Sequence, residues 1–138
     1  MRRILVPFDG SKAAQRAVQY VIKRIRRGEE LLADILYVQP FVVPSEYFGA
    51  EDIERWQKDE IEKVFAKLPM EELGGDLSAK IHVQTGNIVD KIVKFAKKKR
   101  SQEIIMGTRG MSRLQGFFLG SVSTRVVRLS SVPVTLIK

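Results

Sequence analysis

Glu103-Ile104-Ile105-Met106-Gly107-Thr108-Arg109-Gly110, followed after nine more residues by Gly120-Ser121-Val122-Ser123, is the stretch of sequence that decides the fold. The run from Glu103 to Met106 is short, apolar and β-branched, which is typical of a buried parallel strand. The segment after Gly120 has the pattern of a helix. Backbone N–H groups at such a strand-to-helix junction face the gap between the two elements, so the junction predicts a phosphate site.

Strand and helix patterns alternate along the whole chain. Strands are expected over residues 3–8, 31–38, 77–85, 103–106 and 133–137, and helices over 12–25, 53–68, 88–96 and 121–129. This alternation predicts an α/β fold of right-handed βαβ units, a doubly wound five-stranded parallel sheet with helices on both faces. A length of 138 residues with 44% hydrophobic content fits a single domain over 1–138.

Several side chains have an expected place in this fold. Ser11 and Asn87 stand where helix N-caps are preferred. His82 lies within an expected strand, and we interpret it as a packed or edge histidine rather than a catalytic one. The helix over 53–68 carries one apolar stripe that predicts core packing, the tryptophan included: Ile53, Trp56, Ile61, Val64, Phe65 and Leu68.

Charge and composition narrow the classes of partner. The net charge of +8 favours polyanions in general, but its densest clusters, 23–27 and 97–100, fall at expected helix ends, where cations complement the helix dipole. The absence of cysteine excludes disulfides and thiolate metal sites. No apolar run approaches the roughly 18 residues of a membrane span, and the N-terminus lacks a signal peptide's apolar region, so we expect a cytoplasmic protein with no membrane partner.

In the expected strand order 3-2-1-4-5, strands two and three are added on one side of strand one and strands four and five on the other side. Ligands of such sheets bind at this switch point, between strands one and four. Asp9-Gly10-Ser11 follows strand one, and the segment from Gly107 follows strand four. Thirteen residues from Gly107 to Leu119 show no clear element of their own, and long loops in compact domains are usually functional or disordered. The position at the switch point favours function.

The glycines match neither of the common phosphate-binding patterns. The segment lacks the Gly-Lys-Ser/Thr ending of a Walker A loop, and no GxGxxG fingerprint follows strand one. The remaining interpretation is a cradle in which Gly107 and Gly110 let the backbone approach a phosphate and the N–H groups after Gly120 close it. The alternative is that the glycines only make turns and Ser121 only caps a helix.

Asp9 also has two interpretations. Its carboxylate can accept hydrogen bonds from a ribose or help to hold a metal, or it can bond the backbone of the turn that follows. A receiver-type phosphorelay domain also carries acidic residues here, but its reactive aspartate follows strand three. Gln84-Thr85-Gly86 occupies that place, so we do not expect a phosphorelay role.

These residues resemble the universal stress protein family (UspA-like), specifically its ATP-binding branch. That branch is marked by Gly-x2-Gly-x9-Gly-Ser/Thr, which the chain meets with Gly107, Gly110, Gly120 and Ser121. The likeness extends from Ile4-Leu5-Val6-Pro7-Phe8-Asp9-Gly10-Ser11 to Val132-Pro133-Val134-Thr135-Leu136-Ile137. It implies a Rossmann-like fold of the adenine nucleotide alpha hydrolase type and a homodimer formed through the last strand, Pro133 to Ile137. An apolar edge strand of this kind is one that a monomer would have to protect.

The resemblance also implies a nucleotide site. Asp9 would contact the ribose or adenosine part, the backbone at Val38 the adenine, and Met106 with Gly107 would border the nucleoside. Arg109 stands at a variable position inside the motif, where it would add a cation near the phosphates. The full implied set is Pro7, Asp9, Val38, Met106, Gly107, Arg109, Gly110, Gly120, Ser121, Val122 and Ser123. The implied ligand is ATP, with Mg²⁺ or Mn²⁺.

The expected function is that of a nucleotide-dependent sensor or regulator in the stress response. No paired acid and base is recognisable near the loop, so we expect no catalytic residue and at most slow ATP hydrolysis. A weak ATPase or a nucleotidyl-transfer enzyme on the same fold is the alternative. A nucleic-acid-binding module is a third possibility that we do not expect, because aromatic residues do not interleave with the basic clusters.

Overall fold

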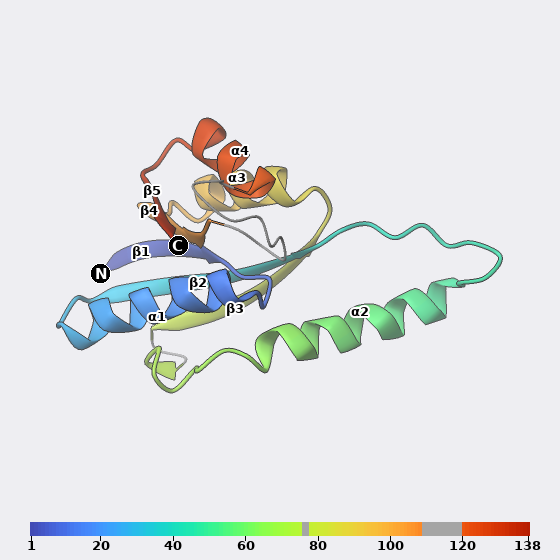
Figure 1. The fold of residues 1–138 in the computed structure, drawn as a ribbon, viewed down its shortest axis with the longest axis horizontal. Coiled ribbons are helices and arrows are strands. Elements are labelled where there is room, and N and C mark those ends of the chain that lie inside the picture. Colours follow the sequence, from blue (N-terminus) through green and yellow to red (C-terminus); the bar gives the residue numbers. More distant parts are fainter. Residues whose placement is uncertain (76–77, 109–119) are drawn as a thin grey trace.

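The structure is a computed structural model that describes residues 1–75, 78–108 and 120–138. Its centre is a five-stranded parallel sheet in the order β3-β2-β1-β4-β5, as predicted (Figure 1). The strands are β1 (Arg2–Pro7), β2 (Leu31–Gln39), β3 (Ala79–Thr85), β4 (Glu103–Gly107) and β5 (Val134–Ile137). The helices are α1 (Lys12–Arg26), α2 (Ala50–Phe65), α3 (Ile88–Lys98) and α4 (Ser121–Leu129). The third strand was expected to begin at Leu77, which lies outside the described residues; Ser78 is a turn residue, and β3 begins at Ala79.

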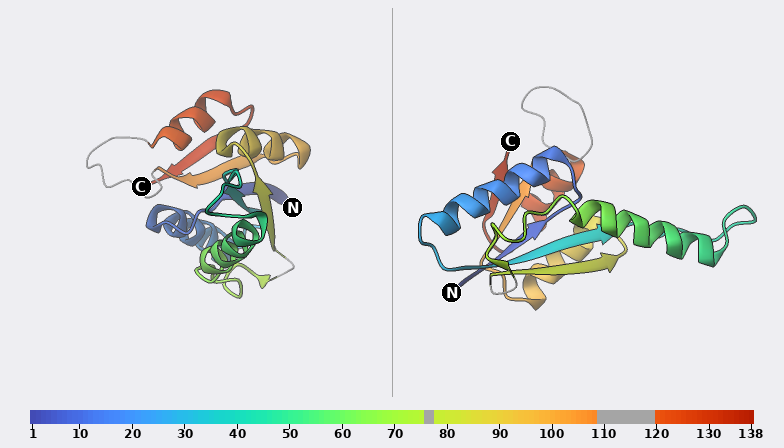
Figure 2. Two further views of the ribbon diagram at one scale, coloured as in Figure 1. Left: turned by 90° about the vertical axis from the view of Figure 1, so that its right-hand side faces the viewer. Right: turned by 90° about the horizontal axis from the view of Figure 1, so that it is seen from below.

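Helices cover both faces of the sheet, so the predicted layering is confirmed. One core cluster packs α1 and the end of α2 against one face, around Ile4, Val6 and Ile35. The other packs α3 and α4 against the opposite face, around Leu5 and Leu36. Figure 2 shows the two helix pairs on opposite sides of the sheet. Successive residues of β1 therefore pack into different core clusters, on opposite faces of the sheet. Both faces of the central strands are buried, which is why their sequences are continuous apolar runs.

The helix ends follow the predicted chemistry. The Ser11 hydroxyl accepts the N–H of Ala14 at 3.2 Å, and the side chain of Asn87 accepts the N–H of Asp90 at 3.0 Å. Both expected N-caps are confirmed. The two basic clusters lie at the ends of α1 and α3, as predicted, on helices that cover opposite faces of the sheet.

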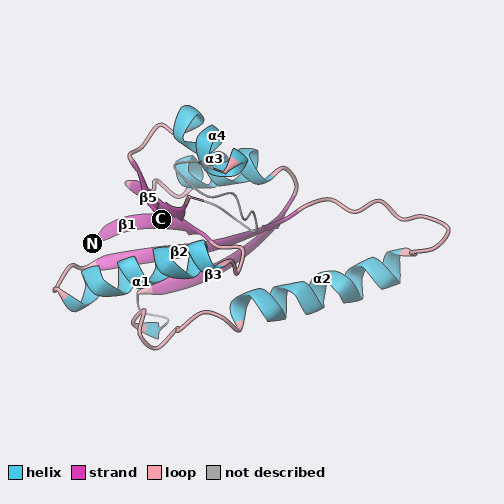
Figure 3. Ribbon diagram, in the orientation of Figure 1, coloured by secondary structure: helices cyan, strands magenta, loops and turns pink. Residues whose placement is uncertain are grey.

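The expected core role of Trp56 is wrong, because 44% of this residue is exposed. The end of α2 and the chain that follows it pack on the sheet, through the buried residues Val64 and Leu68. The beginning of the helix extends past the carboxyl ends of the strands (Figures 1 and 3). An apolar stripe shows which face of a helix would be buried, but not how far the neighbouring sheet reaches along it.

His82 is the packed strand histidine that the sequence predicted. Its Nε2 lies 2.8 Å from Oδ1 of Asp34, and its ring lies edge-on to Phe95 with centroids 4.8 Å apart. Asp34 is fully buried on β2 and also accepts hydrogen bonds from Arg3 at 2.7 and 3.2 Å. These side chains tie three adjacent strands together away from the carboxyl edge of the sheet.

Candidate functional site

A cavity of about 290 Å³ opens at the predicted switch point, between the carboxyl ends of β1 and β4. It takes its walls from the ends of three strands and the starts of three helices. Its described lining is Pro7, Phe8, Asp9, Ser11, Ala14, Leu36, Tyr37, Val38, Ile88, Ile92, Met106, Gly107, Gly120, Ser121, Val122 and Ser123. Nine of the eleven residues implied by the family resemblance are brought together here; the other two, Arg109 and Gly110, lie outside the described residues.

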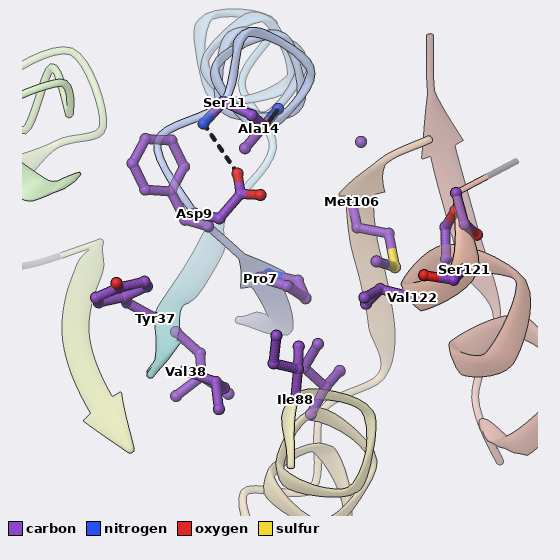
Figure 4. A pocket seen from close by; sticks show the side chains of 16 residues that line it. Pro7, Asp9, Ser11, Ala14, Tyr37, Val38, Ile88, Met106, Ser121 and Val122 are labelled. Atoms are coloured by element: carbon purple, nitrogen blue, oxygen red, sulfur yellow. Dashed lines mark hydrogen bonds between the residues drawn. The ribbon is translucent and has the colours of Figure 1, made fainter. Parts of the chain in front are cut away.

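One side of this switch-point cavity is apolar. The side chains of Pro7, Val38, Ile88, Met106 and Val122 come from five different elements and approach the same space (Figure 4). Burial raises the pKa of the neighbouring Tyr37 hydroxyl, so this ring stays neutral at physiological pH and adds no charge to the wall. A surface of this composition suits a flat, largely apolar group such as a nucleobase.

Asp9 supplies the polar edge of the cavity, and it is the only charged residue among the described lining. Its Oδ1 accepts the N–H of Ser11 at 2.9 Å, so the turn-forming interpretation of this residue is confirmed (Figure 4). Asp9 is exposed, and its Oδ2 has no hydrogen-bond partner in the described part of the chain. The turn thus fixes the direction of the carboxylate and leaves one oxygen facing solvent at the cavity.

The N-terminus of α4 forms the opposite wall. Gly120 is its N-cap, without a side-chain cap, and the first turn contains no acidic residue. The N–H groups of the first turn have no intrahelical acceptor, so together with the helix dipole they favour an anion at this point. Ser121, the first residue of the helix, is exposed and lines the cavity.

Ser123 has a structural role in this wall. Its hydroxyl is buried and donates to the carbonyl oxygens of Thr108, at 2.8 Å, and Gly120, at 3.1 Å. The N–H of Gly120 also donates to the Thr108 carbonyl, at 2.7 Å. These bonds join the two ends of the undescribed segment 109–119, so β4 and α4 are held in a fixed relation on either side of it.

The position of Gly107, which borders the cavity, requires glycine for a packing reason that the sequence did not reveal. A Cβ built on it would lie 2.7 Å from both the carbonyl carbon and the Cβ of Ala13, and 2.9 Å from the Ala13 carbonyl oxygen. Real Cβ atoms essentially never approach other atoms so closely. Glycine is therefore required here for the packing of β4 against the first turn of α1, whatever it does toward a ligand.

Ile88 and Tyr37 are lining residues that sequence reasoning missed. Both lie at the carboxyl edge of the sheet: Tyr37 near the end of β2, and Ile88 as the first residue of α3 after the Asn87 cap. Their position next to a predicted strand end was the available signal. Their apolar character pointed instead to the core, and the helical pattern alone does not separate a core position from a cavity wall.

In the described part of the chain, no three or more His, Asp or Glu side chains are grouped so that they could hold a metal ion. Within the same ranges, no helix has both the length and the apolar character needed to cross a membrane.

The model of the Universal stress protein family matches residues 1–138. The chain belongs to this family. Universal stress protein MJ0531 of Methanocaldococcus jannaschii is 32% identical over 99% of this chain and 82% of its own length. The crystal structure of hypothetical protein PH0823 is 32% identical, with a TM-score of 0.74 over 99% of this chain and 95% of that one.

Three more distant universal stress protein structures, each 21% identical, share the fold and contain adenine nucleotides. One is a complex with cAMP (TM-score 0.60, covering 99% of this chain and 96% of that one). The Arabidopsis thaliana protein has AMP bound (0.66, 100% and 92%), and the Archaeoglobus fulgidus protein is in complex with dAMP (0.56, 100% and 98%). The fold of this family therefore accommodates adenine nucleotides in those proteins.

Proposed function

We propose that this universal stress protein binds ATP in the switch-point cavity and acts as a nucleotide-dependent sensor or regulator in the stress response. The observation that carries the proposal is the cavity itself. An apolar wall, one directed carboxylate and a helix N-terminus free of acidic residues lie around one space. They match a base, a ribose and a phosphate chain in that order.

The proposed contacts follow this order. The adenine lies against Val38 and Met106, the ribose hydroxyls donate to Asp9, and the phosphates meet the N–H groups of Ser121, Val122 and Ser123. Gly110 belongs to the proposed phosphate contacts because of its place in the family's motif, and Arg109, at a variable position of that motif, because it would add a cation near the phosphates. Adenine nucleotides in three proteins of this fold support the class of ligand.

Mg²⁺ or Mn²⁺ would be held mainly by the phosphates. Asp9 is the only carboxylate in the described lining, and Mg²⁺ commonly keeps several waters when it binds one or two carboxylates and phosphate oxygens. The same scarcity favours binding over turnover, because general acid–base catalysis needs a second titratable group within reach. We propose that any hydrolysis is slow.

Thermal unfolding with and without ATP tests the proposal. At roughly 100 times its dissociation constant, ATP with Mg²⁺ adds about 2.7 kcal/mol to the free energy of unfolding, which raises Tm. Gly120→Val adds a branched side chain to the N-cap of α4, a residue that lines the cavity, and we expect it to abolish the shift. A protein whose Tm does not change with ATP and Mg²⁺ contradicts ATP binding.

Gly49→Val is the matched control. Gly49 is also a helix N-cap without a side-chain cap, with φ −78° and ψ 173° against −61° and 160° for Gly120. It precedes α2, outside the cavity lining. We expect Gly49→Val to lose about as much stability as Gly120→Val while keeping the full ATP shift. Equal shifts in both variants would place the phosphates elsewhere.

A further inference from the structure

The connection from β2 to α2 and the beginning of α2 form an arm, residues 40–60, that projects from the body of the protein (Figures 1 and 2). Every residue from 41 to 51 is exposed. Four large apolar residues of this run are exposed to more than half: Phe41 by 78%, Val43 by 81%, Tyr47 by 87% and Phe48 by 61%. Trp56, further along the arm, is 44% exposed. Scattered exposed apolar residues are normal, but several on one short projection indicate an interaction surface.

The charge of the arm is opposite to that of the rest of the chain. The arm holds six acidic residues and two basic ones, a net charge of −4. Because the whole chain carries +8, the residues outside the arm carry +12. A partner that covers this arm must therefore offer both cations and apolar contact. The body of the protein itself has that composition.

A groove between α1 and the chain that follows α2 offers a site of matching chemistry. Its described lining is Lys12, Gln15, Arg16, Val18, Gln19, Lys67 and Pro69. Three of these residues are cations and two are apolar, and none of the described lining is acidic. Lys12, Arg16 and Lys67 are exposed, so the groove faces solvent with its charge accessible.

The positions of the arm and the groove suit a two-fold pair of copies. The arm ends within the first turns of α2, whereas Lys67 and Pro69 of the groove follow the last residue of α2, Phe65. The sixteen residues of α2 span about 24 Å. If two copies place their α2 helices antiparallel, the start of each helix lies beside the end of the other. The arm of each copy then reaches the groove of the other copy, and the arrangement is closed.

We propose that the acidic, apolar arm of one copy docks on the basic groove of a second copy of this chain, and that the second copy does the same in return. The contact is separate from the nucleotide site, because none of the groove residues lines the switch-point cavity. The groove adjoins the residue that follows β5, because Nε of Arg16 donates to the carbonyl oxygen of Lys138 at 2.7 Å, but all its described lining residues lie on α1 or on the chain after α2.

Trp56 reports on this contact directly, because it is the only tryptophan of the chain and lies on the arm. We expect acrylamide quenching of its fluorescence to fall by at least about twofold between about 5 and 500 µM protein, since mass action fills the interface. Raising the ionic strength from about 0.05 to 0.5 M should restore the quenching, because exposed charges are screened. Quenching that is independent of protein concentration overturns the proposal.

Charge reversal separates a second copy from any other partner. Lys12→Glu with Lys67→Glu removes the protection of Trp56, whereas Lys97→Glu with Lys98→Glu, the same charge change at the end of α3, leaves it intact. Adding Glu51→Lys and Glu54→Lys to the groove variant restores the protection, because the arm then carries no net charge and its two new lysines attract the two new glutamates of the groove. Failure of this restoration, with the variants folded by circular dichroism, contradicts the assignment of groove to arm.

The outcome is independent of ATP binding. Glu51→Lys with Glu54→Lys alone should also remove the protection of Trp56, yet keep the ATP-dependent Tm shift of the wild type, because both substitutions lie on the arm and outside the cavity lining. Loss of Trp56 protection with an intact Tm shift concerns only the contact of the arm with the groove. An absent Tm shift in the wild type contradicts only the nucleotide site.

Discussion

Asp34 shows how a single buried charge is accommodated in this sheet. Its side chain is fully buried on a central strand, where burial by itself would raise the pKa of the carboxyl group. The hydrogen bonds from Arg3 and His82 outweigh that effect and hold the pKa of Asp34 below its usual value. Because an ionised carboxylate only accepts hydrogen bonds, Nε2 of His82 is the donor in this contact.

Asp34→Asn should therefore destabilise the fold in a pH-dependent way. A carboxyl group with a lowered folded-state pKa stabilises the fold above its unfolded pKa, about 3.9, and the contribution is lost as pH falls through the folded pKa. We expect the variant to lose about 2–3 kcal/mol at pH 7, less than for a fully buried pair because the side chain of Arg3 is 30% exposed. Urea unfolding checks the difference, which should shrink below about pH 4; an undiminished difference at pH 3 contradicts this role.

At the scale of elements, the sequence predicted the strand order and most boundaries. The last helix was predicted over 121–129 and is observed over those residues, because a glycine start and a clear helical pattern both mark it. Nine implied site residues meet at one cavity because parallel strands end at a common edge. The exposure of Trp56 could not be predicted, since it depends on how far α2 outruns the sheet. The same holds for the packing role of Gly107, which depends on the distance to α1.

The contact between β4 and α1 gives the prediction at this scale. Gly107→Ala forces a Cβ against the backbone of Ala13, and overpacking of this kind costs about 1–3 kcal/mol. Ala13→Gly removes the Cβ of residue 13 but leaves its carbonyl carbon and oxygen at 2.7 and 2.9 Å, so the double variant should be no more stable than Gly107→Ala. Chemical unfolding of the single and double variants measures this. Full recovery in the double variant would show that only the two side chains collide.

At the scale of the whole molecule, the open side of β5 is where we propose that the homodimer forms. The carbonyl oxygens of Pro133 and Ile137 accept hydrogen bonds from Ile104 and Thr108. Because alternate residues of a parallel strand bond to the same neighbour, the peptide groups of 133, 135 and 137 face β4. The N–H of Leu136 then points away from β4, toward the edge where the described part of the chain places no further strand, and we propose that it pairs there with the same strand of a second copy.

Leu136→Pro tests this interface because proline removes that outward N–H while the bonds to β4 remain. Leu136→Ala is the control, since it loses similar packing against the second core cluster but keeps the N–H. We expect sedimentation to show a dimer for the wild type and Leu136→Ala and a monomer for Leu136→Pro. The measurement belongs at about 0.5 M salt, where the contact of the arm with the groove is screened. A Leu136→Pro dimer as tight as that of Leu136→Ala would mean that backbone pairing along β5 does not hold the two copies together.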